Sequence, residues 1–170
     1  MARRSDVHPI IAQIPHLRRY ARALLGDANL ADDLVQDCLE RAWSRLHLWR
    51  AGSNLRTWLF TIMHNLHANS VRSAVRRPPP APYDDIAFAV PSRATQEDAL
   101  EVASLADALA HLPDEQRAVI LLVGLEEMTY QEAASVLGVP IGTVMSRLHR
   151  GRERLRVLLT GGGAALRRVK

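Results

Sequence analysis

Residues 129–155 constrain the fold more than any other stretch, because they carry start and stop signals for two consecutive helices. Thr129 is followed three residues later by Glu132, the capping-box pattern that satisfies two free backbone N–H groups at a helix start. Gly138 favours the left-handed conformation that ends a helix, and Pro140 prevents its continuation. A second helix is predicted directly after this proline. A short helix, a tight turn and a second helix are the layout of a helix-turn-helix.

The second predicted helix has one apolar face and is otherwise rich in arginine. At about 100° per residue, one stripe should pack on the preceding helix and consists of Val144, Leu148, Gly151, Leu155 and Leu158. Residues 142–158 hold five arginines against one glutamate. This excess favours contact with DNA, where guanidinium groups bind phosphates or guanines, over a surface helix whose arginines only confer solubility.

Charge is distributed unevenly along the 170 residues, although the net charge is only +4. Residues 1–77 carry a net charge of +6, residues 78–112 one of −5 and residues 113–170 one of +3. All the basic groups except Lys170 are arginines. Two basic segments around an acidic one indicate two surfaces for a polyanion, joined by a segment that does not bind it.

Cysteine usage and hydropathy exclude several classes of protein. Cys38 is the only cysteine, so a scaffold held by intramolecular disulfides is excluded. Its place in an apolar helical pattern favours a buried small side chain over a redox sensor. No apolar run approaches the roughly 20 residues that a membrane span requires, and no secretion signal is visible. We therefore expect a cytoplasmic protein.

The predicted fold is all-α, with two small helical domains joined by a flexible, proline-rich acidic linker. The domains are 8–77 and 100–158, the linker is 78–99, and 159–170 form a loose basic tail with three consecutive glycines. The linker would reach about 70 Å if extended at about 3.1 Å per residue. Three signals set helix starts in the first domain: Pro15 in a first turn, Asn29 as a cap, and Ser53 or Asn54 as a cap.

Three motifs in order resemble the compact two-domain bacterial sigma factors of the extracytoplasmic-function (ECF) group. Residues 31–43 (ADDLVQDCLERAW) are similar to the family's segment for docking on core RNA polymerase. Residues 55–66 (LRTWLFTIMHNL), running on toward residue 77, are similar to its promoter-melting and minus-ten segment. Residues 112–155 are similar to its minus-thirty-five domain. One helix-turn-helix is weakly specific, whereas the three motifs in this order are highly specific.

The resemblance implies a core-polymerase-binding face on the helix that carries the first motif. Its members are Asp33, Gln36, Asp37 and Glu40, which share the face away from Leu34 and Cys38. An acidic face suits docking against arginines of a partner. Without the resemblance, an ordinary solvated helix face is the simpler interpretation.

The resemblance also implies two sets of DNA contacts. The minus-ten set is Arg56, Trp58, Asn65, Asn69, Arg72, Arg76 and Arg77, with the amides receiving an extruded base. Core packing is the alternative for Trp58. The minus-thirty-five set is Thr143, Ser146, Arg147, His149, Arg150 and Arg152, with His149 and Arg150 as base-reading candidates. Met145 departs from the family pattern, in which a basic residue is common.

The function implied is a promoter-specificity subunit that is not an enzyme, needs no cofactor, and acts with core RNA polymerase on promoter DNA under an anti-sigma factor. The acidic linker residues Asp84 and Asp85 are hypothesised to mimic RNA phosphates in a polymerase channel. A stand-alone helix-turn-helix regulator is the alternative. An enzyme acting on nucleic acid is disfavoured, since no nucleophile–base set or phosphate-binding glycine loop is present. His64 and His67 alone make a poor metal site, and no metal is expected.

Overall fold

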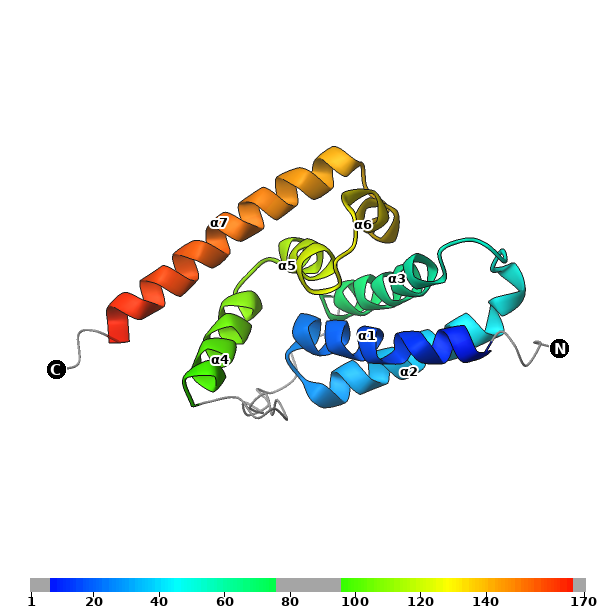
Figure 1. The fold of residues 1–170 in the computed structure, drawn as a ribbon, viewed down its shortest axis with the longest axis horizontal. Helices are drawn as coiled ribbons and strands as arrows, with labels where there is room; N and C mark the ends of the chain where they lie inside the picture. The colour runs from blue at the N-terminus through cyan, green and yellow to red at the C-terminus, as the bar shows by residue number, and fades with distance from the viewer. Residues whose placement is uncertain (1–6, 76–95, 167–170) are drawn as a thin grey trace.

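The computed structural model describes residues 7–75 and 96–166, and every regular element in these two ranges is a helix (Figure 1). The first lobe contains α1 (Val7–Leu25), α2 (Ala28–Ser44), the short 3-10 helix η1 (Leu46–Leu48) and α3 (Leu55–Val75). The second lobe contains α4 (Gln96–Ala110), α5 (Asp114–Ile120), the π-helical segment η2 (Leu121–Leu125), α6 (Tyr130–Leu137) and α7 (Ile141–Leu166). The all-α prediction with a helix-turn-helix at α6 and α7 is confirmed.

The core of the first lobe forms where α1, α2 and α3 pack together. The rings of Tyr20 and Phe60 meet edge to face, with centroids 5.3 Å apart and an interplanar angle of 69°. Cys38 is fully buried beside them, and its Sγ donates a 3.5 Å hydrogen bond to the carbonyl oxygen of Leu59. Burial raises the pKa of the Cys38 thiol to about 12. The prediction of a buried small side chain is confirmed.

Two of the predicted helix starts in the first lobe are wrong, and one is confirmed. Helix α1 begins at Val7 and contains Pro15 in its interior. Ile10 is 6% exposed, so the apolar stripe starts before the proline and its burial offsets the missing hydrogen bond. Asp27, not Asn29, caps α2, because its carboxylate accepts a hydrogen bond from the N–H of Leu30. Asn54 caps α3 as predicted, accepting from the N–H of Thr57 at 3.1 Å.

The helix-turn-helix has the predicted local geometry. Thr129 and Glu132 form both hydrogen bonds of a capping box at the start of α6. Gly138 ends that helix with φ 64° and ψ 35°, in the left-handed region. Gly151 of α7 is buried against α5, where an added Cβ would lie 2.8 Å from the Cδ1 of Ile120. The absence of a side chain at residue 151 lets α5 and α7 approach closely.

The carboxy-terminal part of α7 differs from the predicted pattern. Val144 and Leu148 are buried and Leu155 is half-buried, as predicted, but Leu158 is 37% exposed. Helix α7 is much longer than α6, the helix on which its apolar stripe was predicted to pack. The helix continues to Leu166, so the prediction of a loose tail beginning at residue 159 is wrong as far as residue 166.

The linker between the lobes can be described only at its end. Helix α4 begins at Gln96, inside the predicted linker 78–99. Arg76, Arg77, Asp84 and Asp85 lie outside the described residues.

The two lobes pack against each other in the described residues. Helix α6 lies on α3, and η2 lies on α1 (Figure 1). One cluster of buried side chains runs through both lobes and includes Leu17 and Leu59 from the first and Leu122 and Val136 from the second. Helices α4 and α7 diverge from each other away from this contact (Figure 1). We call this state, in which the two lobes are in contact, the closed arrangement. The candidate surfaces are described below in this arrangement.

Candidate polymerase, DNA and partner interfaces

The acidic face of α2 is exposed to solvent. Its four members, Asp33, Gln36, Asp37 and Glu40, are exposed, whereas Leu34 and Cys38 on the opposite side of the helix are buried. The amide of Gln36 donates a 3.1 Å hydrogen bond to Glu40. No ion pair with a described basic side chain occupies the carboxylates of Asp33 or Asp37. The predicted division of this helix into a buried and a free acidic face is confirmed.

The carboxy-terminal half of α3 presents amides and one arginine. Asn65, Asn69 and Arg72 are all exposed. Arg72 donates to the side-chain oxygen of Asn69 at 2.9 Å and to the carbonyl oxygen of Ala68 at 3.2 Å, which holds this arginine along the helix. Trp58 is half-buried against the core, as its packing alternative predicts.

The recognition-helix candidates on α7 divide into a free set and an engaged set. His149, Arg150 and Arg152 are exposed, and so is Met145 beside them. Arg147 is only 23% exposed, and its guanidinium pairs with Glu115 of α5 at 2.8 Å. Ser146 donates to the carbonyl oxygen of Thr143 at 3.1 Å. His149, Arg150 and Arg152 are thus the exposed members of the predicted minus-thirty-five set.

A buried carboxylate joins the lobes, and the sequence patterns gave no indication of it. The side chain of Glu126, which follows η2, has no exposed surface. It accepts from the Nε of Arg19 at 2.9 Å and from the Nη2 of Arg56 at 2.6 Å, and it lies 3.2 Å from the Nδ1 of His16. We call Glu126, His16, Arg19 and Arg56 the inter-lobe clasp. Arg56, a predicted minus-ten contact, is therefore engaged inside this closed arrangement.

Two further polar contacts cross between the lobes. His67 of α3 is buried, and its Nε2 lies 2.9 Å from the carboxylate of Asp114 at the start of α5. The hydrogen bond from His67 holds the pKa of Asp114 below its ordinary value, against the opposing effect of burial. The amide of Asn54 donates a 2.8 Å hydrogen bond to Glu132 of the capping box. His67 is thereby part of an inter-lobe contact, and within the described residues no cluster of three metal-ligating groups is found.

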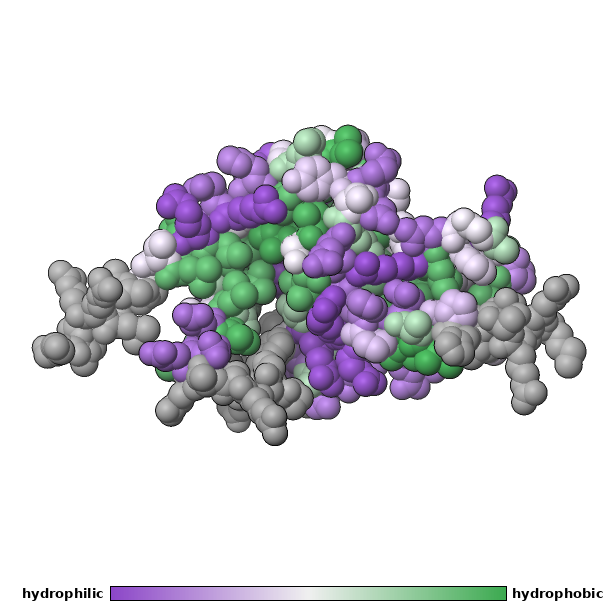
Figure 2. Space-filling view, in the orientation of Figure 1, coloured by the Kyte–Doolittle hydropathy of each residue, from purple (hydrophilic) through white to green (hydrophobic). Residues whose placement is uncertain are grey.

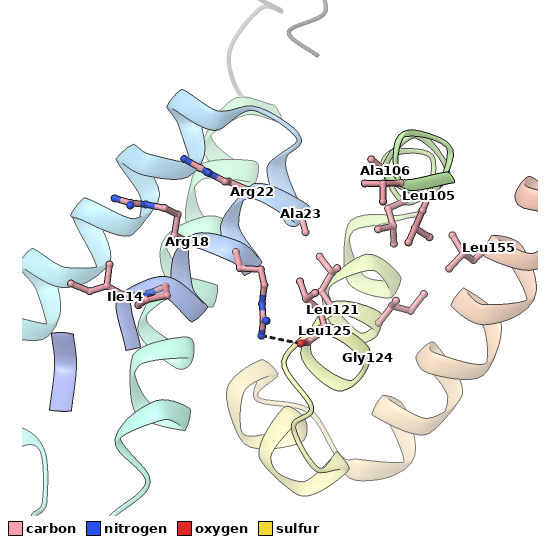
Figure 3. Close-up of a pocket in the computed structure, with 15 residues that line it drawn as sticks. Ile14, Arg18, Arg22, Ala23, Leu105, Ala106, Leu121, Gly124, Leu125 and Leu155 are labelled. Atoms are coloured by element: carbon pink, nitrogen blue, oxygen red, sulfur yellow. Dashed lines mark hydrogen bonds between the residues drawn. The ribbon is translucent and has the colours of Figure 1, made fainter. Parts of the chain in front are cut away.

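An apolar groove of about 720 Å³ lies between α1, α4, η2 and α7 (Figure 3). Its apolar walls include Ile14, Leu105, Leu121, Leu125 and Leu155 (Figure 3). Arg18 and Arg22 of α1 border the groove, but their side chains extend away from it and pair with Asp32 of α2. The apolar surface continues outward between the diverging α4 and α7, where Figure 2 shows a hollowed apolar area. Exposed apolar side chains on these two helices include Leu100, Val102, Val157 and Leu159. An exposed apolar surface of this kind is typical of a protein-binding site. No described helix is long and apolar enough to cross a membrane.

Comparison with known proteins identifies the family. Residues 10–64 match the model of the sigma2 domain of PhyR, and residues 103–155 match sigma-70 region 4. The chain is 39% identical to the ECF RNA polymerase sigma factor EcfG of Rhodopseudomonas palustris strain TIE-1 over 91% of this chain and 85% of that one. The sigma factor RpoE of Bartonella quintana, solved with the anti-sigma factor NepR, superposes with a TM-score of 0.79 at 33% identity, covering 90% of this chain and 95% of that one.

A second solved relative has the same two-lobe fold. CnrH, solved with the cytosolic domain of CnrY, superposes with a TM-score of 0.68 at 28% identity, covering 93% of this chain and 89% of that one. Both family models, the relatives and the fold agree over nearly the whole described chain. The chain belongs to the ECF sigma factors, the subunits that direct bacterial RNA polymerase to promoters.

Proposed function

We propose that this sigma factor docks on core RNA polymerase through the acidic face of α2 and contacts promoter DNA through α3 and α7. The observation that carries the docking surface is the exposure of Asp33 and Asp37 without ion-pair partners among the described residues. Unpaired carboxylates on a rigid helix suit a partner surface of arginines, since charge complementarity speeds association and selects the partner. The chain acts as a non-catalytic subunit, in the cytoplasm where bacterial transcription takes place.

Promoter contact is divided between the two lobes. Asn65 and Asn69 on α3 have exposed amide groups that can hydrogen-bond an unstacked base of the minus-ten element, although the amide oxygen of Asn69 already accepts from Arg72. His149 and Arg150 on α7 face solvent beside Met145, which offers an apolar contact to a thymine methyl group. A stand-alone regulator has no use for the docking face on α2, and the match to the sigma2 family model over residues 10–64 argues against it.

Reconstitution with core polymerase tests this function. The purified chain should convert core polymerase into an enzyme that makes promoter-dependent transcripts, whereas the chain alone should not bind a promoter duplex stably. Asp33→Arg with Asp37→Arg should abolish core binding at unchanged helix content. Glu97→Arg with Glu101→Arg, an equal charge change at two exposed positions of α4 with the same spacing, is the matched control. Core binding that survives the double variant would remove α2 as the docking surface.

An anti-sigma factor is the proposed regulator, and the groove beside α1 is its proposed site. Two solved relatives, RpoE and CnrH, were captured with NepR and with the cytosolic domain of CnrY. The groove has apolar walls, and Arg18 and Arg22 at its edge pair with Asp32 of α2 at 3.2 and 3.7 Å. The apolar walls fit the apolar face of an amphipathic helix. Leu105→Asp should weaken binding of a cognate anti-sigma factor more than Leu30→Asp, a change at an exposed leucine away from the groove.

A further inference from the structure

The inter-lobe clasp places a carboxylate where water cannot reach it. Glu126 has no exposed side-chain surface, and its three partners all come from the first lobe: His16 and Arg19 from α1 and Arg56 from α3. The main-chain carbonyl of Glu126 also accepts from Arg56 at 2.6 Å, and Arg19 donates to the carbonyl of Leu125 at 3.1 Å. Every one of these bonds is lost if the lobes separate.

When the lobes separate, water replaces these hydrogen bonds to Glu126 and its partners. When only one charged side chain is removed and the lobes stay closed, the remaining charges are buried without a partner. A buried ion pair is a weak source of net stability, but removal of one partner is costly because an uncompensated charge remains buried. The clasp therefore makes the closed arrangement specific: it forms only when α1, α3 and the end of η2 meet. Neutralising Glu126 leaves two guanidinium groups against a neutral amide and should favour separation of the lobes.

The closed arrangement cannot occupy both promoter elements at once. Helix α3 packs directly on α6 of the helix-turn-helix, where Asn54 donates a 2.8 Å bond to Glu132. His67 of α3 also lies 2.9 Å from Asp114 at the start of α5. The minus-ten and minus-thirty-five elements lie about 25 base pairs apart by their names, which is about 85 Å of B-form DNA at about 3.4 Å per base pair. The lobes have to separate before both elements can be bound.

We propose that the inter-lobe clasp is an autoinhibitory contact that holds the free sigma factor closed and keeps Arg56 from DNA until the lobes separate. This rests on the proposed function in one respect, namely that α3 and α7 bind two elements of one promoter. The docking face on α2 stays exposed in the closed form, so core polymerase can make its first contact while the clasp is intact. Binding energy from the polymerase and the promoter then opens the clasp.

Glu126→Gln is the variant that tests the proposal, because it preserves side-chain shape and leaves every proposed DNA and core contact in place. Glu127→Gln, at the exposed neighbouring position, is the matched control. Arg19→Gln removes a clasp partner in the first lobe, at a side chain that is 50% exposed. This second variant keeps the test valid if the Glu126 variant does not fold. Helix content and urea unfolding establish that each variant is folded.

The distance between the lobes is measured first, in the full chain without polymerase. Fluorescent labels at cysteines introduced at Ala51 and Arg154, both exposed, report separation by energy transfer, and small-angle scattering reports the overall dimensions. Glu126→Gln and Arg19→Gln should lower the transfer efficiency and increase the radius of gyration, while Glu127→Gln should match the unmodified chain. Two folded clasp variants that stay as compact as the control would overturn the proposal.

Promoter-complex formation at limiting sigma factor is measured second. Apparent affinity scales with the fraction of molecules in the competent state, so opening variants should form promoter complexes at concentrations lower by about tenfold if about a tenth of the free chain is open. A folded, open Glu126→Gln chain with no gain over Glu127→Gln would refute autoinhibition. The interdomain distance does not depend on core docking, so failure of the α2 double variant and failure of the clasp are separate outcomes.

Discussion

The guanidinium of Arg117 in α5 donates a 2.8 Å hydrogen bond from Nη1 to the carbonyl oxygen of Leu24, in the last turn of α1. The same side chain donates to the carbonyls of Leu109, Ala110 and Leu112, at and just after the end of α4. One arginine of the second lobe thus satisfies free carbonyls at the ends of two helices, one of them in the first lobe. It fixes α4 and α1 relative to α5.

Arg117→Ala should lower the free energy of unfolding by about 3 kcal/mol, because several hydrogen bonds from a charged group are lost together and three partly buried carbonyls lose this donor. Arg117→Lys should restore less than half of this loss, since an ammonium group cannot reproduce the planar fork that spans four carbonyls. Urea unfolding followed by circular dichroism gives both values. A loss below 1 kcal/mol for the alanine variant would show that water replaces the guanidinium at little cost.

Arg150→Ala should weaken promoter binding by the holoenzyme by about 1–3 kcal/mol and alter the preference at the minus-thirty-five element. Arg150 is exposed on α7 next to His149, so its removal should not unfold the helix-turn-helix. Binding to promoters with single substitutions in that element measures the change. Arg45→Ala, an exposed arginine of the first lobe, serves as the control. An unchanged sequence preference would exclude Arg150 from base reading.

Gly151→Ala should destabilise the second lobe, whereas Gly161→Ala in the same helix should stabilise it. A Cβ at residue 151 would meet the Cδ1 of Ile120 at 2.8 Å and the Cβ of Gln116 at 3.3 Å, while nothing lies within 4 Å at residue 161. Overpacking costs about 1–3 kcal/mol and outweighs the gain in helix propensity of up to about 1 kcal/mol at residue 151. Thermal unfolding of the two variants should give shifts of opposite sign.

Cys38 should resist thiol reagents at pH 8 in the native chain and react rapidly in denaturant. Burial raises its pKa from 9.0 to about 12, so the folded state holds the thiol proton more tightly than the unfolded state does. The stability contributed is complete below pH 9 and is lost as the pH rises toward 12, at up to about 1.4 kcal/mol per pH unit. Cys38→Ala should flatten this slope in unfolding measured from pH 8 to pH 11. The pKa of Tyr20 is also raised by burial, so part of the slope should remain.

Local chemistry predicted those features of the fold that depend on a few neighbouring residues. The capping box at Thr129, the left-handed Gly138 and the cap at Asn54 all follow from side-chain groups within three or four positions of the backbone they bind. Periodicity likewise separated the buried and exposed faces of α2. The start of α1 was missed because burial of Ile10 outweighs the helix-breaking signal of Pro15.

Contacts between the lobes escaped prediction because their partners are far apart in the chain. Glu126 and Arg19 are separated by 107 positions, and nothing near either residue identifies the other. The adjacent Glu127 is exposed, so acidic character alone does not reveal which of the two carboxylates is buried. The family resemblance places Arg56 and Arg147 among the DNA contacts, although both form ion pairs in the closed arrangement.

The π-helical segment η2 determines where Glu126 points. The N–H of Glu126 donates to the carbonyl of Leu121, five residues back, at 3.0 Å, so this turn contains one residue more than a regular α-helical turn. Gly124 lies exposed within it. Loss of a single codon here would rotate the carboxylate by about 100° around the helix axis without touching its chemistry. A chain shortened by one residue here would turn Glu126 away from Arg19 and Arg56 although every charged side chain is retained.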